Sequence, residues 1–105
     1  MIKLYRADEN ENLSDRAVEI VMDGVKKSFP AGSVVRLTPG ESITFTPGTY
    51  HRFWGEKGKG TVIVGEVSMC NDDNSDNRFY DTVGRFPKIE EDEKPLYLLC
   101  NEYPR

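Results

Sequence analysis

The sequence predicts an all-β domain, a sandwich or a small barrel, and three observations predict it. The apolar runs are short and show little sign of the 3.6-residue period of helices. Gly and Pro separate these runs at close spacing, as in domains built from many short strands. The length of 105 residues suits one domain, residues 1–105, with a modest core, because such a chain buries roughly two thirds of its unfolded surface.

Turn residues divide the first part of the chain into strands. A polar loop at 6–15 follows the first strand. Asp23-Gly24 predicts a hairpin between two later strands, because both central positions of a type I′ turn need a positive φ. Turns at 30–32 and 38–41 each precede a further strand. The predicted strands are 2–5, 17–22, 25–29, 33–37 and 42–46.

The second part of the chain continues this pattern with longer polar segments. The Pro-Gly turn at 47–48 leads into a further strand. A Lys/Gly turn at 56–60 leads into residues 61–68, TVIVGEVS, whose β-branched composition favours a strand. Residues 71–78 form a polar loop by composition, and 96–100, LYLLC, are expected to close the domain as a buried strand.

The net charge and the hydropathy of the sequence argue against two classes of binding partner. The net charge is −4 and the basic residues are scattered, so we expect no nucleic-acid partner. No apolar run approaches the roughly 20 residues that span a bilayer, and the first residues lack the parts of a signal peptide. We therefore expect no membrane partner and a cytoplasmic location. Cys70 and Cys100 are too far apart for a C-x-x-C motif and are expected to be free thiols.

His51 is the only histidine and lies beside the aromatic residues Tyr50, Phe53 and Trp54. Two interpretations stay open: a metal ligand with partners elsewhere, or an ordinary packed residue. A catalytic divalent site needs about three or four protein ligands. One histidine plus a carboxylate such as Glu66 would hold manganese only weakly, because imidazole nitrogens normally anchor such a site.

Two segments resemble one protein family. Gly40, Pro47, Gly48 and His51 resemble the second conserved motif of the cupins, small barrels that usually hold one divalent metal. Residues 65–104, GEVSMCNDDNSDNRFYDTVGRFPKIEEDEKPLYLLCNEYP, are similar to the C-terminal portion of the D-lyxose isomerase family of cupins. The resemblance implies a cupin-like double-stranded β-helix, a jelly-roll barrel. We expect it to be partly truncated, since the N-terminal His-x-His segment of the family has no counterpart here.

The resemblance also implies a function. It implies a divalent metal of the manganese type and the interconversion of a pentose aldose and its ketose, D-lyxose and D-xylulose. His51 matches the histidine of the second motif, and the two histidines of the first motif are missing. The expected function is therefore isomerisation if the metal site can be completed. The alternative is a shortened barrel without metal, which binds sugar or another protein.

Glu66 is the candidate catalytic base. Strict alternation along 61–68 puts it on the same face as Val62 and Val64. If this face lines the barrel, the carboxylate is desolvated and suits the proton transfer that isomerisation needs. The alternative is that both valines face a partner subunit and Glu66 lies at the rim, since periodicity gives a face but not its direction.

Further candidates come from the polar segments. Asp73 and Asp76 are candidate substrate contacts, and Arg85 is a candidate catalytic residue, because carboxylates and guanidinium groups pair with several sugar hydroxyls. Trp54 is a candidate for stacking on a sugar. The alternatives are that the aspartates cap the loop and that Trp54 packs in a core or an interface. We also expect a homodimer, because an unpaired barrel edge is a template for a second chain.

Overall fold

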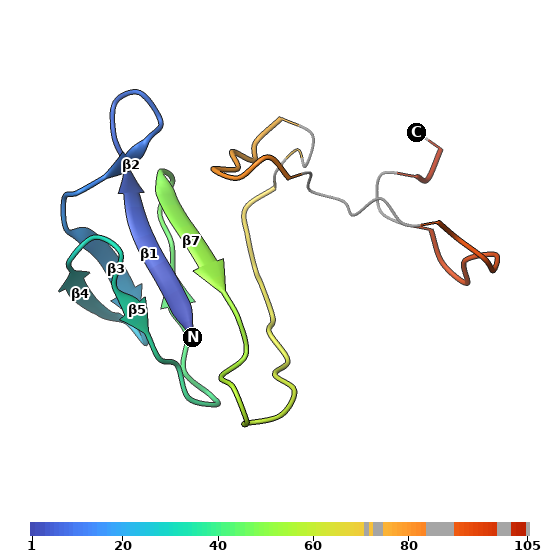
Figure 1. Ribbon diagram of the computed structural model, residues 1–105, viewed down its shortest axis with the longest axis horizontal. Helices are drawn as coiled ribbons and strands as arrows, with labels where there is room; N and C mark the ends of the chain where they lie inside the picture. The colour runs from blue at the N-terminus through green and yellow to red at the C-terminus, as the bar shows by residue number, and fades with distance from the viewer. Residues whose placement is uncertain (71, 73–74, 84–89, 99–101, 105) are drawn as a thin grey trace. The chain divides into compact units, whose positions relative to one another are not determined.

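The computed structural model describes residues 1–70, 72, 75–83, 90–98 and 102–104. These residues contain strands and no helix, which confirms the all-β prediction, and no helix among them has the length and hydropathy of a membrane span. The chain divides into two units, Met1–Met69 and Cys70–Arg105, and the strands lie in the first (Figure 1). The prediction of a single domain over 1–105 stays a prediction.

Strand β1 (Ile2–Ala7) is the centre of the first sheet (Figure 1). Strand β7 (Thr49–Phe53) runs antiparallel along one edge of β1. The other edge is shared by two short antiparallel strands, β2 (Leu13–Ser14) and β5 (Val34–Val35). Residues alternate between the two faces of β1, so that Ile2 and Leu4 are buried on the same face.

The second sheet has the order β4-β3-β6, and all its pairings are antiparallel. Its strands are β3 (Val18–Met22), β4 (Val25–Phe29) and β6 (Ile43–Thr44). The turn between β3 and β4 has φ of 47° at Asp23 and 81° at Gly24. Both values are positive, so the predicted type I′ hairpin is confirmed.

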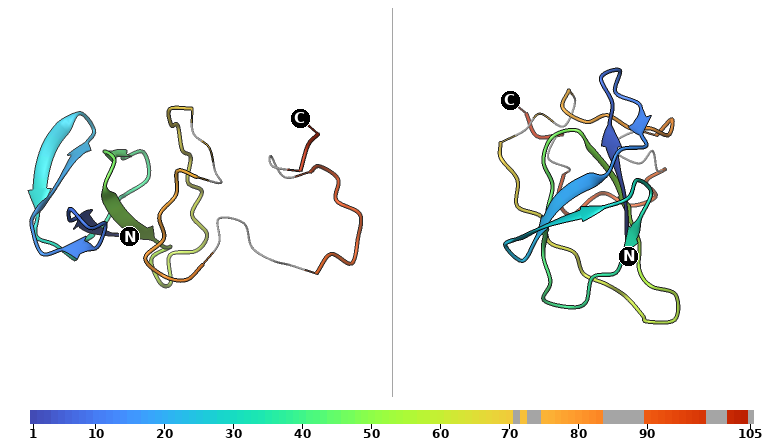
Figure 2. Two further views of the ribbon diagram at one scale, coloured as in Figure 1. Left: turned by 90° about the horizontal axis from the view of Figure 1, so that it is seen from above. Right: turned by 90° about the vertical axis from the view of Figure 1, so that its left-hand side faces the viewer.

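The core lies between these two sheets, whose layers are separated in the left-hand view of Figure 2. Every second residue of β3 is buried, as expected for a strand with one face on the core. Phe29, Leu37, Ile43 and Phe45 are partly buried around the core. This sandwich of two antiparallel sheets is consistent with a fragment of a cupin-like jelly roll. The buried residues are Ile2, Leu4, Val18, Ile20, Met22 and Val35.

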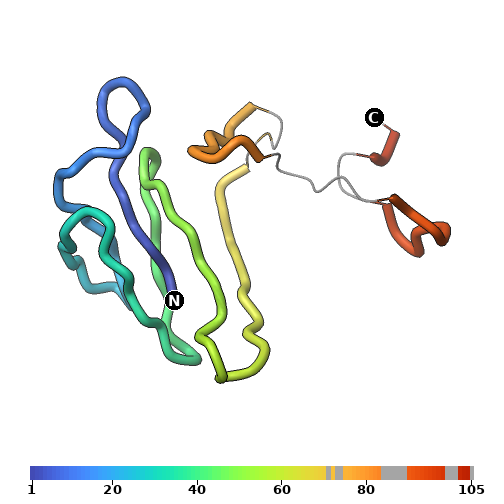
Figure 3. The backbone as a smooth tube through the Cα atoms, viewed as in Figure 1, coloured from blue at the N-terminus to red at the C-terminus, as the bar shows by residue number. Residues whose placement is uncertain are grey.

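Several predicted strands are shorter in the structure or do not form, and these predictions were wrong in extent. The expected strands at 33–37 and 42–46 shrink to β5 and β6. Residues 61–68 form no strand, although the Lys/Gly turn before them does form, with Lys59 N–H donating to the Glu56 carbonyl (Figure 3). A β-branched composition favours a strand only where a neighbouring strand supplies hydrogen bonds and packing.

The predicted closing strand at 96–100 also differs from expectation. Its described residues, 96–98, belong to no strand, and Leu96 is 88% exposed. Residues 99 and 100, and with them Cys100, lie outside the described residues. An apolar run alone therefore did not suffice to predict burial, because burial requires a facing surface.

The hairpin turn gives a prediction for stability. Gly24 has a φ of +81°, and a Cβ added there would meet nothing within 4 Å. Gly24→Ala should therefore cost only the backbone penalty of the left-handed region, about 1–2 kcal/mol of unfolding free energy. Urea unfolding followed by circular dichroism measures this loss. The matched control is Gly65→Ala, where the space is also open and the φ is not in that region; an equal loss there would contradict the explanation.

Candidate functional site

His51 lies in β7, directly opposite the buried Leu4 of β1. Its side chain is exposed, and its ring stacks on Phe45 with centroids 4.2 Å apart and an angle of 12° between the planes. The Nδ1 atom lies 3.3 Å from the carbonyl oxygen of Thr49. Because a carbonyl can only accept, this contact is a hydrogen bond in the tautomer with the proton on Nδ1, which leaves the lone pair on Nε2. Nε2 is thus the nitrogen available to a metal.

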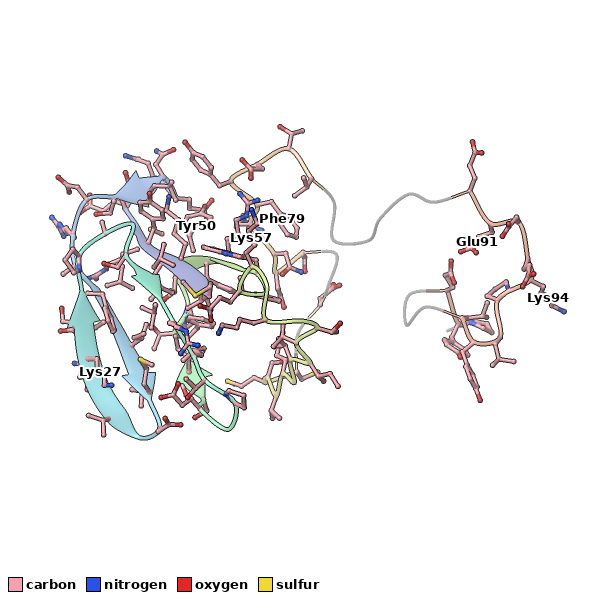
Figure 4. The ribbon with its side chains drawn as sticks, turned by 60° about the horizontal axis from the view of Figure 1, so that its bottom comes forward. Lys27, Tyr50, Lys57, Phe79, Glu91 and Lys94 are labelled. Carbon is pink, nitrogen blue, oxygen red and sulfur yellow. The ribbon has the colours of Figure 1, made fainter. Side chains whose placement is uncertain are left out.

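The turn before β7 holds this strand in place. Gly48 has a φ of 79°, and its carbonyl accepts a hydrogen bond of 2.7 Å from the N–H of Ala7. The hydroxyl of Tyr50, labelled in Figure 4, donates to the carbonyl of Glu11 at 2.7 Å. The Pro-Gly pair at 47–48 therefore has a local structural role: it precedes β7, whose register with β1 places His51 opposite Leu4.

The described residues do not by themselves fit a manganese site. Within them, no group of three or more His, Cys, Asp or Glu side chains is arranged to hold a metal ion. His51 can offer one nitrogen, and a catalytic divalent site needs about three protein ligands. His51 is thus one candidate ligand, and the described residues show no group that completes a site around it.

The structure does not place Glu66 on the interior face of a barrel, which was one of the two positions considered. It is exposed and lies in a segment without strand pairing, so that no barrel face surrounds its carboxylate. The physical reason is the missing neighbour strand, since alternation along 61–68 defines an inside only when the segment joins a sheet. Its assignment as the catalytic base stays a prediction.

Trp54 follows β7, and its backbone forms hydrogen bonds with Met1 at the start of the chain. Its N–H donates to the carbonyl of Met1 at 3.0 Å, and its carbonyl accepts from the terminal amino group at 3.1 Å. The side chain is 40% exposed. The indole is therefore accessible for stacking, and its role as a sugar contact stays a prediction.

Asp76 organises a turn in the second unit. Its carboxylate accepts a hydrogen bond of 2.7 Å from the N–H of Asp72, and its own N–H donates to the carbonyl of Asp72 at 2.9 Å. This is the capping behaviour that was the alternative for the loop. Its substrate role stays a prediction. Asp73 and Arg85 lie outside the described residues.

Two of the hollows among the described residues lie in the first unit, and His51 lines neither of these two. The larger, about 740 Å³, is formed by the ends of β1 and β2 and the loop between them. The smaller, about 360 Å³, includes residues 46–49 of the turn before β7. Both are lined by Arg6, Ala7 and Asp8, but the Asp8 carboxylate already accepts from the N–H groups of Asn10 and Asn12. Neither hollow joins the predicted site residues.

The sequence reasoning missed two carboxylates that fix the loop before β6. Asp23 accepts from the N–H and the hydroxyl of Ser42 at 2.8 and 3.0 Å, and these bonds lower the pKa of Asp23 below 3.8. Glu41 accepts from the N–H of Thr38, which lowers the pKa of Glu41. The available signal was the spacing in TPGES, in which a carboxylate follows a Thr-Pro-Gly turn. The Asp23 bonds join the β3–β4 hairpin to the residue before β6, and the Glu41 bond closes the turn at 38–41.

Asp23 predicts a pH dependence. Its pKa is lower in the folded chain than its ordinary value of 3.8. The stabilisation is therefore fully present above pH 3.8 and is lost as the pH falls through the lower folded pKa. Asp23→Asn should flatten the fall in urea-unfolding free energy between about pH 5 and 2, while Asn still tolerates the positive φ. The control is Asp15→Asn, another exposed carboxylate; equal flattening in both variants would contradict the assignment.

The comparisons with known proteins identify the family. The D-lyxose isomerase family matches residues 1–103. A D-lyxose/D-mannose isomerase of Serratia proteamaculans is 51% identical over 105 residues, which are all of this chain and 46% of the relative. One of Escherichia coli O157:H7 is 48% identical over 103 residues, 98% of this chain and 45% of the relative. One of Thermosediminibacter oceani is 34% identical over 68 residues, 65% of this chain and 36% of the relative.

The share of each relative that is matched limits what the comparisons show about this chain. The chain spans about half the length of the first two curated relatives it matches. The match to the family nevertheless runs from the start of β1 through nearly all of the second unit, and it includes His51 and Glu66. The resemblance inferred from the sequence is confirmed, and the chain belongs to the D-lyxose isomerase family.

Proposed function

We propose that the chain forms part of a sugar isomerase that interconverts D-lyxose and D-xylulose. The observation that carries the proposal is the setting of His51: an exposed imidazole whose ring stacks on Phe45 and whose Nδ1 lies 3.3 Å from the carbonyl oxygen of Thr49, so that Nε2 is the nitrogen left for a metal. Metal-binding histidines commonly donate their second ring nitrogen to a carbonyl in this way. The names of the relatives, D-lyxose/D-mannose isomerase, support a sugar substrate.

The reaction moves a proton between C1 and C2 of the sugar. A base must remove the proton from one carbon and return it to the other, and we assign this role to Glu66. A divalent metal of the manganese type, when bound, supplies polarisation of the carbonyl. No step of the proposal is routed through it, because the described residues do not complete its site.

The remaining candidates are assigned to the substrate. Asp73 and Asp76 would accept hydrogen bonds from sugar hydroxyls, and Arg85 would donate to a substrate oxygen. Trp54, whose indole is partly exposed, would cover an apolar face of the sugar. The complete family polypeptide is the proper material for the test, because this chain spans about half the length of the first two curated relatives.

The test uses a chimeric protein, called here the fused protein. The 105 residues of this chain replace the matching region of the Serratia proteamaculans relative, which is 51% identical, and the conversion of D-lyxose to D-xylulose is assayed with manganese and after chelation. We expect turnover with manganese. The unaltered relative serves as the positive control. A fused protein that folds by circular dichroism but shows no turnover would overturn the proposal and favour the alternative of a barrel without catalysis.

A further inference from the structure

We propose that the outer face of the first sheet binds the phosphate group of a small phosphorylated molecule through Lys3 of β1 and Arg52 of β7. The outer face is the side of this sheet that is turned away from the core. Lys3 and Arg52 alternate along their strands with Leu4 and His51, which share the other face. The proposed phosphate site is therefore separate from the candidate metal site, and it does not depend on the proposed isomerase activity.

Lys3 and Arg52 lie directly opposite each other in the register of β1 and β7. The side chains of such a pair leave the same face of the sheet, with Cβ atoms roughly 4.5–5.5 Å apart. Like charges in this position repel each other and destabilise the pairing. An anion bound between the two side chains would offset the repulsion, so this position favours a negatively charged ligand.

The strands of the first sheet supply no carboxylate that could balance these two charges. They contain Lys3, Arg6 and Arg52 but no Asp or Glu, although the whole chain has 18 acidic and 14 basic residues. Arg6 lies on the other face of β1, and its charge, after the larger effect of Lys26, lowers the pKa of Glu19 in the second sheet. In the part of the chain that the structure describes, neither Lys3 nor Arg52 forms an ion pair.

The cations of the second sheet have a different setting. Lys26 forms an ion pair of 2.9 Å with Glu19. Lys27, labelled in Figure 4, is opposite the apolar Ile20. Among the strand pairings of the described residues, only Lys3 and Arg52 place two charged side chains directly opposite each other. The excess of positive charge is therefore specific to the outer face of the first sheet.

Aromatic side chains hold Lys3 on this face. Its Nζ atom lies 5.4 Å from the centroid of the Tyr5 ring, which is within the range of a cation–π interaction. Tyr5 in turn packs over Gly32, where an added Cβ would lie 2.9 Å from the Tyr5 hydroxyl oxygen. Tyr50 is directly opposite Tyr5 and shares the face. Because Lys3 is already partly ordered, it loses less conformational entropy when a ligand binds.

The charge of the pair indicates which anion fits. A phosphate monoester carries a charge of about −1.5 to −2 at pH 7, so that one group balances both cations, whereas a carboxylate balances only one. The guanidinium of Arg52 can donate two parallel hydrogen bonds to a phosphate, and Lys3 adds a point charge. The rings of Tyr5 and Tyr50 offer an apolar surface beside the cations for the carbon skeleton of the ligand. A phosphorylated sugar combines these properties.

The experiment titrates the isotopically labelled chain with inorganic phosphate at constant ionic strength and follows its amide signals and the Arg52 Nε–H by NMR. We expect saturable shifts confined to β1 and β7, with a dissociation constant on the order of 1 mM. Sulfate, also a dianion, should bind within about threefold of phosphate, and the singly charged acetate roughly tenfold more weakly or less. Ribose 5-phosphate should bind at least as tightly as inorganic phosphate, because its sugar can pack on the tyrosine rings.

Three variants test the two cations. Lys3→Gln and Arg52→Gln should each weaken phosphate binding by roughly tenfold, because each removes a charged donor. Lys27→Gln on β4 is the matched control, since it removes the same charge from another exposed strand, and it should change the affinity by less than about twofold. In buffer without phosphate or sulfate, Arg52→Gln should also raise the midpoint of urea unfolding, because the repulsion with Lys3 is lost.

Several outcomes would overturn the inference. Shifts spread over the whole chain, or equal weakening by Lys27→Gln and Arg52→Gln, would show that anions respond only to the overall charge. Acetate binding as tightly as phosphate would show that the pair does not select a dianion. The absence of saturation below about 100 mM phosphate, the failure of ribose 5-phosphate to bind, or a lower urea midpoint for Arg52→Gln would also contradict the proposed site.

Discussion

Replacing Leu4 by alanine is expected to lower the free energy of unfolding by roughly 3 kcal/mol. Leu4 is fully buried at the centre of β1, between the two sheets. The substitution removes apolar contacts and leaves a cavity, because backbone pairing on both sides of β1 prevents collapse. The buried core of the described residues is small, so a loss of this size is a large part of the stability of the unit.

Urea unfolding, followed by circular dichroism and by the fluorescence of Trp54, measures the effect of Leu4→Ala. Val25→Ala is the control, because Val25 is 58% exposed and its truncation removes little buried surface. We expect it to change the free energy by less than about 0.5 kcal/mol. Equal losses in both variants, or a loss for Leu4→Ala below about 1 kcal/mol, would contradict the assignment of the core.

Replacing His51 by alanine in the fused isomerase is expected to reduce both manganese affinity and turnover by about 100-fold or more. Loss of a partner that only orients a metal ligand typically costs 10-fold to 100-fold, and loss of the ligand itself should cost at least as much. The control is Arg52→Ala, the next residue of β7, which is also exposed. We expect this variant to keep both properties within about threefold.

A substitution at Phe45 tests whether His51 acts as a metal ligand or only supports the structure. The Phe45 ring stacks on His51 and is partly buried against the core. Phe45→Leu should leave Nε2 present but less well oriented, so manganese affinity should fall by roughly 10-fold and less than in His51→Ala. Titration calorimetry with manganese alone measures this order. Unchanged manganese affinity in His51→Ala would remove His51 from the metal site.

The parts of the fold that depend on local rules were predictable from the sequence. Asp23-Gly24 specified its turn because few residues accept a positive φ, and β3 and β4 followed on either side. The segment 61–68 was not predictable in the same way. Its composition gives a preference for strand structure, whereas a strand also needs a neighbouring strand to pair with, and no local pattern encodes that neighbour.

The candidate site also combines features that the sequence predicted with features that it could not predict. His51 was identifiable because it is the only histidine and follows the Pro-Gly turn. Its stacking on Phe45 and its contact with Thr49 depend on the turn that starts β7, and residue types alone do not give them. The bonds from Ser42 to Asp23 were missed because they join residues 19 apart that come together only when β6 pairs with β3.

The most direct test of the proposed site is elemental analysis for manganese after dialysis, made on this chain alone and on the fused protein. We predict almost no manganese on the chain alone and about one ion per chain in the fused protein, because we propose that His51 is one ligand and that other groups complete the site. About one ion on the chain alone, or none in a folded fused protein, would contradict the proposal.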